Sequence, residues 1–203
     1  MPRLTDEVRA QRRRHVLTSA WSCFSRDGFH ATSMDQIIAA TGMSSSAVYG
    51  YFRSKDDLID ATVDEALGQL GELFAALLNT SPAPTPYEVF DALVGNIRSR
   101  MRNPDYDLSQ LAMQAWVEAL RRPHLAKRVA EFYRLVREHL YGLAQRWQEA
   151  GQLGPDADAA SVAALLATLM PGMIVSEQLV DRVSPDQLIA GMAGLAGQRR
   201  DPA

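Results

Sequence analysis

Polar side chains gather in residues 42–57, which read GMSSSAVYGYFRSKDD. Three serines, Ser44 to Ser46, are followed by two tyrosines and by Lys55. Serine and tyrosine hydroxyls can donate hydrogen bonds to phosphate oxygens and to base edges, and a lysine ammonium binds phosphate as a point charge. These residue types at this spacing predict a surface that touches an anionic partner.

Charge is divided unevenly along the 203 residues, whose net charge is −3. Residues 1–55 hold eight Lys or Arg against four acidic residues, a net charge of +4. The remaining residues hold 13 basic and 20 acidic side chains, a net charge of −7. This asymmetry favours a polyanion as the partner of the N-terminal part, and ordinary fluctuation of charge between segments is the alternative.

Catalytic and metal-binding chemistry has little support in the residue spacing. The histidines are scattered, and none stands at metal-ligand spacing from another histidine or from Cys23. Cys23 falls inside a helical apolar pattern, which predicts a buried packing role. A small all-helical enzyme is therefore the weaker alternative, and we expect no metal and no cofactor.

Short helices must position these polar groups. A first helix is predicted over residues 5–27 and ends at Gly28, where a residue that tolerates positive φ is favoured. Its apolar residues share one helical face: Val16, Leu17, Ala20, Trp21 and Phe24. Ser33 and Gln36 form a capping-box pattern at the start of a second helix, which stops at Gly42.

Ser44 is predicted to cap a third helix of about seven or eight residues, too short to persist without packing. Met43 before it and Val48 after it are placed to form a hydrophobic staple. The next two serines are not needed for capping and share the exposed N-terminal face with Tyr49. This third helix is therefore the one that presents polar groups outward.

Ser54 is predicted to cap a fourth helix, which keeps helical apolar spacing to Asn79. Lys55 stands at its positive end, where a lysine costs a small electrostatic penalty unless it meets an anion. A solvated surface lysine is the alternative interpretation.

Two short helices joined by a turn with glycine, the second with small polar residues at its N-terminus, are typical of a DNA-binding helix-turn-helix. The segment GFHATSMDQIIAATGMSSSAVYGYFRSKDDLI resembles the DNA-binding signature of the TetR family of transcriptional repressors. The resemblance covers residues 10–60 without a gap. It depends on the glycine-aromatic pair after the first helix and on Thr32-Ser33, Gly42, Tyr49, Phe52, Ser54-Lys55 and Leu58.

The resemblance implies a dimer of all-α subunits with about nine helices each. Residues 1–55 would form the helix-turn-helix DNA-binding domain, and residues 56–203 the effector-binding and dimerisation domain. Such a protein binds a near-palindromic operator and releases it when a small molecule enters the C-terminal domain. The family's DNA contacts carry over onto Thr32 or Ser33, Ser44, Ser45, Ser46, Tyr49, Tyr51 and Lys55. The same fold acting as a partner-binding module without DNA recognition is the alternative.

Ser45 and Ser46 depart from many relatives, which have a large polar residue early in the third helix. Serine offers no bidentate fork to a base. Operator specificity is therefore expected to depend more on DNA shape, on water, or on the N-terminal arginines. These arginines, for which a solvated helix face is the alternative, are Arg3, Arg9, Arg12, Arg13 and Arg14.

The rest of the chain predicts further helices after the Pro-rich connector TSPAPTP. In residues 156–180 the run SVAALLATLMPGMIV is apolar on every side, so a second surface must cover it. We expect the last two helices to pair with their two-fold mates in a four-helix bundle. The residues expected at or near this seam are Leu165, Leu166, Leu169, Val175 and Leu179. Pro171 either bends its helix for packing in the bundle or opens room beside a ligand cavity.

Methionine and aromatic side chains of the second domain favour an apolar small-molecule effector, although a core role is the alternative for each. The candidate pocket residues are Phe74, Phe90, Met101, Met113, Trp116, Phe132, Tyr133, Met170 and Met173. The N-terminus lacks the apolar core of a secretory signal, and no apolar run approaches the ~18 residues of a membrane helix. We therefore expect a cytoplasmic protein without a membrane partner.

Overall fold

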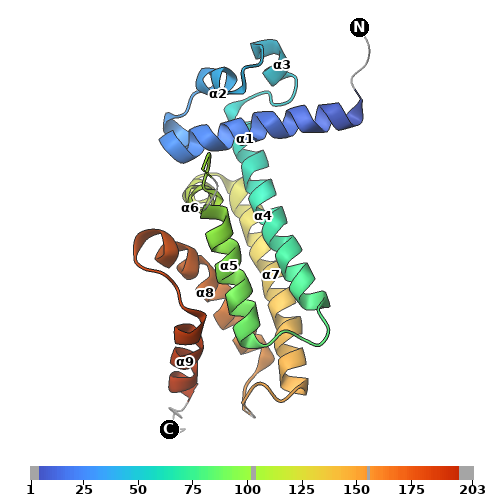
Figure 1. Cartoon of the computed structure of the whole chain (residues 1–203), viewed down its shortest axis with the longest axis vertical. Helices are drawn as coiled ribbons and strands as arrows, with labels where there is room; N and C mark the ends of the chain where they lie inside the picture. Colours follow the sequence, from blue (N-terminus) through green and yellow to red (C-terminus); the bar gives the residue numbers. More distant parts are fainter. Residues whose placement is uncertain (1–4, 102–103, 155, 197–203) are drawn as a thin grey trace. The chain divides into compact units, whose positions relative to one another are not determined.

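The computed structural model describes residues 5–101, 104–154 and 156–196, and within them the chain forms helices and no strands (Figure 1). The predicted all-α class is confirmed for this part of the chain. The helices are α1 (Asp6–Ala31), α2 (Met34–Thr41), α3 (Ser45–Tyr49), α4 (Lys55–Asn79), α5 (Pro86–Met101), α6 (Leu108–Ala119), α7 (Pro123–Glu149), α8 (Ala159–Leu179) and α9 (Pro185–Ala196).

The chain divides into two compact units. Unit 1 combines Met1–Gln69 with Arg100–Val129, and unit 2 combines Leu70–Ser99 with Ala130–Ala203. Unit 1 therefore holds α1, α2, α3, the first part of α4, α6 and the start of α7. The functional division after residue 55 stays a prediction.

Helix α1 has an N-terminal cap and a glycine break, each formed by a residue type that favours it. Thr5 caps α1, because its side-chain oxygen accepts a hydrogen bond from the Val8 N–H at 3.4 Å. Gly28 has φ 82°, a conformation that glycine adopts without strain, and it interrupts the helical dihedrals of α1 three residues before that helix ends. The predicted glycine-induced break is therefore confirmed.

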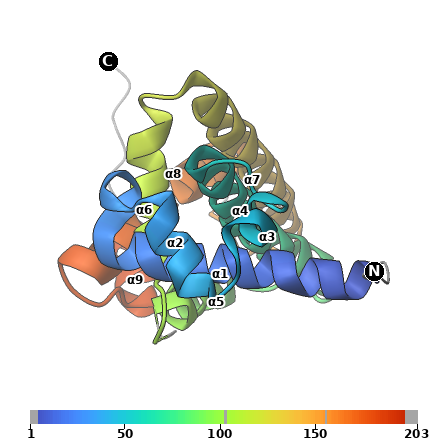
Figure 2. The same ribbon diagram turned by 90° about the horizontal axis from the view of Figure 1, so that it is seen from above.

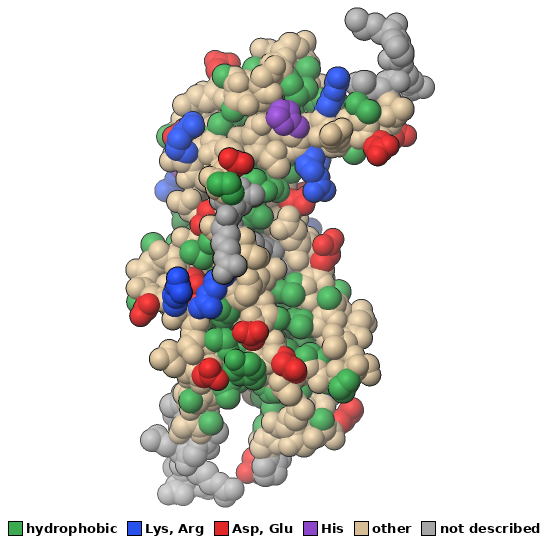
Figure 3. Space-filling view, viewed as in Figure 1, with side chains coloured by type: hydrophobic (Ala, Val, Ile, Leu, Met, Phe, Trp, Pro, Cys, Tyr) green, Lys and Arg blue, Asp and Glu red, His purple; other side chains and the backbone are tan. Residues whose placement is uncertain are grey.

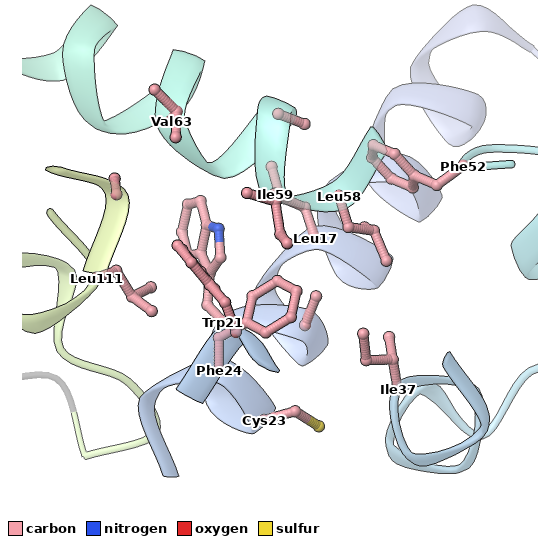
Figure 4. Close-up of a cluster of buried hydrophobic side chains, with 14 of the residues drawn as sticks. Leu17, Trp21, Cys23, Phe24, Ile37, Phe52, Leu58, Ile59, Val63 and Leu111 are labelled. Atoms are coloured by element: carbon pink, nitrogen blue, oxygen red, sulfur yellow. The ribbon is translucent and has the colours of Figure 1, made fainter. Parts of the chain in front are cut away.

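The core of unit 1 joins helices that lie far apart in sequence. Figure 4 shows Trp21 and Phe24 of α1 among Ile59 of α4, Ile37 of α2 and Leu111 of α6. The one polar atom of the Trp21 ring is satisfied, because its Nε1–H donates to the Thr62 hydroxyl at 3.0 Å. This core fixes α2, α4 and α6 against α1.

Unit 2 is built around large buried side chains, which include Phe74, Phe90, Leu140, Leu143 and Trp147. The end of α4 is held by Arg146 of α7, whose guanidinium donates to the carbonyl oxygens of Leu78 at 2.6 Å and Thr80 at 2.7 Å. These two bonds satisfy carbonyls that a helix C-terminus leaves without an intrahelical partner.

Helix α8 contradicts the expectation that no apolar stretch approaches the length of a membrane helix. It contains an 18-residue window of mean hydropathy 1.8, so by length and composition alone it is apolar enough to cross a membrane. The sequence reading considered only the uninterrupted run of apolar letters and missed this window. Of this window 28% is buried within the chain, and the rest of α8 is half-buried or exposed.

Candidate nucleic-acid interface

The second helix of the unit 1 motif begins and ends as its sequence predicts. Ser33 forms both bonds of a capping box: its Oγ accepts from the Gln36 N–H at 3.2 Å, and its N–H donates to Gln36 Oε1 at 2.6 Å. Gly42 ends α2 in the left-handed region with φ 64°. In Figures 1 and 2, α2 and α3 lie across the same side of α1.

Helix α3 differs from the prediction in two respects. It has five residues rather than seven or eight. Ser44 occupies the N-cap position, but its side chain makes no capping hydrogen bond and instead lies 3.3 Å from the Ser46 hydroxyl. Its backbone carbonyl accepts from the Ala47 and Val48 N–H groups at 3.0 and 3.1 Å. The hydroxyl of Ser44 is therefore on the surface beside that of Ser46.

The side chains predicted to touch DNA differ in how exposed they are. Ser33, Ser45 and Ser46 are exposed, Tyr49 has 45% of its surface exposed, and Tyr51 is half-buried against the core of unit 1. Thr32 is 1% exposed. Its hydroxyl donates to the Gly28 carbonyl at 2.7 Å.

The expectation for Thr32 as a side-chain contact is therefore wrong, because its hydroxyl serves the turn after α1. Of the pair that the resemblance offered, Ser33 alone presents its side chain to solvent.

Lys55 is bound within the protein. Its ammonium donates to the carbonyl oxygens of Thr32 at 2.9 Å and His30 at 3.2 Å. The solvated alternative is thus wrong for this side chain. The acceptor is the carbonyl end of α1 and its turn, which carries the partial negative charge that a lysine favours.

Basic side chains line α1 beside this surface. Arg9, Arg12, Arg13 and Arg14 are exposed, and the guanidinium of Arg13 also lies 4.9 Å from the centre of the Phe52 ring, a cation–π contact. Figure 3 shows Lys and Arg side chains along α1 on the visible face. Arg3 lies outside the described residues.

A groove of about 480 Å³ lies between α1 and the start of α3. Its lining residues are Gln11, Arg12, His15, Met43, Ser44 and Ala47. One side of the groove thus carries a guanidinium and an imidazole, and the other carries the first serine of the exposed set. This arrangement can bring a phosphate oxygen and a base edge to neighbouring parts of one surface.

Sequence reasoning missed several residues that hold this surface. The His15 ring contacts the Thr41 carbonyl across 26 positions of sequence at 2.9 Å. Gln114 of α6 accepts from the Phe29 N–H at 3.0 Å and donates to the Phe24 carbonyl at 3.2 Å, which ties α6 to the kink of α1. No local pattern predicts such partners, because each bond joins segments that meet only in the folded chain.

The sequence also did not predict a network of ion pairs in unit 1. Glu118 of α6 is buried and pairs with Arg122 and with the ring of His30 at 3.2 Å. Arg122 reaches Asp56 in the first turn of α4 at 2.8 Å. The hydrogen bond that the Arg122 guanidinium donates to the Asp56 carboxylate raises the pKa of the guanidinium, so this group stays charged. A buried carboxylate is expected to be paired in this way.

The effector-pocket candidates do not all fall in one unit. Phe74, Phe90, Phe132, Met170 and Met173 are buried in unit 2, and Tyr133 lines a groove of about 280 Å³ between α7 and α8. Three other candidates are half-buried and belong to unit 1: Met101, Met113 and Trp116.

The seam candidates of α8 divide into inner and outer positions. Leu165 is 46% exposed, Leu179 is 69% exposed and Val175 is also exposed, whereas Leu169 is half-buried. Leu166 is 4% exposed and belongs to the core of its own subunit, so its assignment to the seam is wrong. A helix that is apolar all round has no periodic signal to show which residue faces inward.

Two other sequence predictions concern single residues. Cys23 is buried as predicted, and burial raises the pKa of its thiol, which keeps it protonated and unreactive at neutral pH. Pro171 is accommodated inside α8 with a half-buried ring, and whether it serves packing or a cavity stays open.

A short helix whose exposed N-terminal face carries hydroxyls, fixed against a second helix by a glycine turn, defines a helix-turn-helix DNA-binding protein. Residues 16–62 match the family model of bacterial regulatory proteins of the tetR family, and residues 96–196 match that of the C-terminal part of BetI-type transcriptional repressors. The chain belongs to the TetR family of transcriptional regulators, which are ligand-responsive DNA-binding proteins rather than enzymes.

Relatives cover nearly the whole chain. It is 25% identical over 193 residues to the uncharacterised HTH-type transcriptional regulator YfiR of Bacillus subtilis, covering 95% of this chain and 91% of YfiR. The solved structure of Salmonella enterica GusR is 26% identical with a TM-score of 0.71, covering 97% of this chain and all of GusR. The SmeT–triclosan complex shares the fold, with a TM-score of 0.71, 20% identity, and coverage of 95% of this chain and 99% of that one.

Proposed function

We propose that this chain is a cytoplasmic homodimeric repressor that binds a near-palindromic operator and releases it when a small apolar effector binds in unit 2. The observation that carries the DNA-binding part is the exposed face of α3. Ser45, Ser46 and Tyr49 are held outward by a packed helix-turn-helix, and these side chains have no role in the core of unit 1.

The contacts divide into base readout and backbone positioning. Ser45 and Ser46 stand at the first positions of α3, where small side chains let the helix approach base edges in the major groove. Tyr49, Ser33 and the exposed arginines of α1 supply donors to the phosphates. Most of the affinity then comes from charge, and the sequence preference comes from α3 and from DNA shape.

A second copy of the chain is proposed as the cover for α8. The exposed Leu165, Val175 and Leu179 give this helix an outward apolar face. Burying such side chains contributes about 25 cal/mol per Å² of apolar surface removed from water. A two-fold dimer places two copies of α3 side by side on one DNA duplex, which is what a palindromic operator requires.

The effector is proposed to be apolar because the candidate side chains in unit 2 are aromatic or methionine: Phe74, Phe90, Phe132, Tyr133, Met170 and Met173. Triclosan, the compound named with SmeT, is an apolar aromatic probe for this proposal. The three half-buried candidates that lie in unit 1 are left out of the proposed pocket, which is thereby confined to unit 2.

Binding to the DNA immediately upstream of its own gene tests the function. Fluorescence anisotropy should show tighter binding to this duplex than to a scrambled duplex of equal length, by a factor in the range of about 10³ or more for a specific regulator. Tyr49→Ala should weaken both interactions. Equal affinity for the two duplexes would support a partner-binding module instead.

A panel of apolar aromatic compounds that includes triclosan tests the effector class. An effector must bind the DNA-free conformation more tightly, so it should raise the thermal midpoint of the free protein and weaken operator binding together. A charged, strongly polar compound that does both, when none of the apolar compounds does, would contradict the proposed class.

A further inference from the structure

A second cleft in unit 1 lies between α1 and the middle of α4. Its volume is about 390 Å³, and every residue that lines it belongs to unit 1. Small-molecule sites usually measure about 300–1,000 Å³. Residues 10–21 of α1 form one wall, Glu65 and Gln69 of α4 form the opposite wall, and Tyr106 closes a third side. The cleft shares Gln11 alone with the groove at the start of α3, so the two are separate surfaces.

The floor of this cleft is apolar and aromatic. Leu17 and Trp21 lie there with 3% and 4% of their surface exposed, so the floor is part of the core of unit 1. The Trp21 ring is held in place, because its Nε1–H donates to the Thr62 hydroxyl at 3.0 Å. The Tyr106 ring meets it edge-on, with the ring centres 5.0 Å apart. Such a floor favours contact with a planar apolar group.

The walls of the cleft carry a net positive charge. Arg13 and Arg14 of α1 supply two guanidinium groups, and the half-buried Glu65 supplies one carboxylate, so the sum is +1. Glu65 accepts from Gln69 Nε2 at 3.2 Å, and among the described residues neither arginine forms an ion pair with it. One negative charge on a ligand would therefore balance the site. A guanidinium binds a carboxylate through two parallel hydrogen bonds.

We propose that this cleft binds a small aromatic carboxylate, and that its occupancy weakens DNA binding by drawing Arg13 and Arg14 away from the phosphates. The carboxylate pairs with the two guanidinium groups, and the aromatic body lies against Trp21 and Tyr106. The effect on DNA rests on the DNA-binding function proposed above, whereas the binding of the carboxylate does not. This site is distinct from the pocket in unit 2, for which an uncharged apolar effector is proposed.

Loss of phosphate contacts has a recognisable effect on DNA affinity. Phosphates are the same in every sequence, so the carboxylate should weaken binding to operator and scrambled duplexes by the same factor. The slope of log affinity against log salt should fall by about 0.9 for each arginine withdrawn. A compound that acts by reorienting α3 would instead weaken operator binding more than non-operator binding.

Calorimetric titration of the DNA-free protein with 2-naphthoate tests the site itself. The neutral isostere 2-naphthamide and the small anion acetate should each bind at least about tenfold more weakly, because one lacks the charge and the other lacks the aromatic body. Arg14→Met should weaken naphthoate binding by about tenfold or more, since it removes a hydrogen-bonded charge. Glu65→Gln should tighten it, because the charge of the lining rises from +1 to +2. Equal affinity for naphthoate and naphthamide, or no effect of Arg14→Met, would overturn the site.

A variant that fills the cleft tests its link to DNA. Gln69→Trp adds bulk from α4, away from the proposed DNA contacts, and should keep the DNA affinity of the ligand-free protein while losing naphthoate binding. Gln69→Ala leaves the cleft open and is the matched control, with naphthoate binding retained. Arg14 is exposed, so the result for Arg14→Met decides the site even if Gln69→Trp fails to fold.

Anisotropy titrations with and without 2-naphthoate complete the test. In the wild type the compound should weaken binding to both duplexes equally, and in Gln69→Trp it should have no effect. Naphthoate that binds in the cleft without changing DNA affinity, or that weakens DNA binding equally in Gln69→Trp, would overturn the regulatory part. A wild type that does not discriminate the operator would contradict the proposed function alone, since calorimetry of the free protein still decides the site.

Discussion

At the scale of single residues, the exposed hydroxyls of α3 are the part of the surface proposed to read the DNA sequence. Ser46 stands at the second position of α3, and the one described partner of its side chain is the hydroxyl of Ser44 at 3.3 Å. That exposed contact contributes little to folding. A change at Ser46 is therefore expected to affect recognition rather than stability.

Ser46→Ala should alter which bases the protein prefers at the positions next to α3. A base contact from a side chain discriminates by about 1–3 kcal/mol when it is well formed, and a single hydroxyl belongs at the lower end of that range. Competition binding against a set of operator variants with one changed base pair measures the effect. A uniform loss over all variants would show that Ser46 contacts the backbone instead.

A partly buried ion pair in unit 2 gives a residue-scale prediction about pH. Burial acts to raise the pKa of Glu177, but hydrogen bonds from Arg98 and from the Val183 N–H outweigh it and lower that pKa below its usual value. The Arg98 guanidinium meets the carboxylate at 2.9 Å and also donates to the Val183 carbonyl. The pair thus joins α5 to α8, and the bonds of both side chains to Val183 add the segment between α8 and α9.

Because the Glu177 pKa is lower in the folded than in the unfolded state, the pair stabilises the fold fully above the unfolded pKa of about 4.3. This contribution is lost as pH falls through the folded pKa. Glu177→Gln should cost about 1.5–3 kcal/mol at pH 7, the value of hydrogen bonds to a charged group. Its unfolding free energy should then change less than that of the wild type between pH 6 and pH 3, as urea titrations would measure. Parallel pH profiles would contradict the assignment.

At the scale of elements, short-range signals in the sequence were sufficient where both partners are close in the chain. The capping box of Ser33 and Gln36 and the left-handed Gly42 were predictable because each depends on residues within one turn. The Lys55 contacts were not, because the carbonyls that accept from it are 23 and 25 positions away. Helix α3 is shorter than predicted, because it ends at Tyr49 and Gly50 is its C-cap.

Glycine substitutions in α4 and after α2 should act in opposite directions. Gly68 lies inside α4, and a Cβ added there would meet no other atom within 4 Å. Gly68→Ala should therefore stabilise the protein by about 1 kcal/mol through helix propensity. Gly42→Ala should destabilise it by about 1 kcal/mol or more, because a side chain at φ +64° is strained although the space is open. Thermal unfolding of the two variants measures both signs, and stabilisation by Gly42→Ala would refute the role of this turn.

At the scale of the whole molecule, the exposed apolar side of α8 is the feature for which a second copy is proposed as cover. The sequence predicted an uncovered apolar helix correctly, but could not separate Leu165 from Leu166, because neighbouring positions of an all-apolar helix give the same pattern. The effector pocket was harder still, since buried methionine and aromatic residues serve equally as core or lining.

Leu165→Glu should prevent dimerisation while leaving each subunit folded, since Leu165 is 46% exposed in the single chain. A charge buried in an apolar seam is costly unless it is paired. Leu166→Glu is the matched control: it places the charge in the subunit's own core and should unfold the protein. Sedimentation velocity and circular dichroism distinguish the two outcomes. A Leu165→Glu variant that remains dimeric would move the seam away from this face.

The central claim, that two copies of the chain read one duplex through paired α3 helices, is tested most directly by changing the spacing of the operator. Half-sites bound by a two-fold dimer lie about 34–36 Å apart, one turn of about 10–10.5 base pairs, so they face the same side of the DNA. Inserting five base pairs between the half-sites turns one of them to the opposite face. We predict that anisotropy titrations show two subunits bound per native duplex and an affinity for the inserted duplex close to that for a single half-site. Undiminished affinity for the inserted duplex would contradict the account.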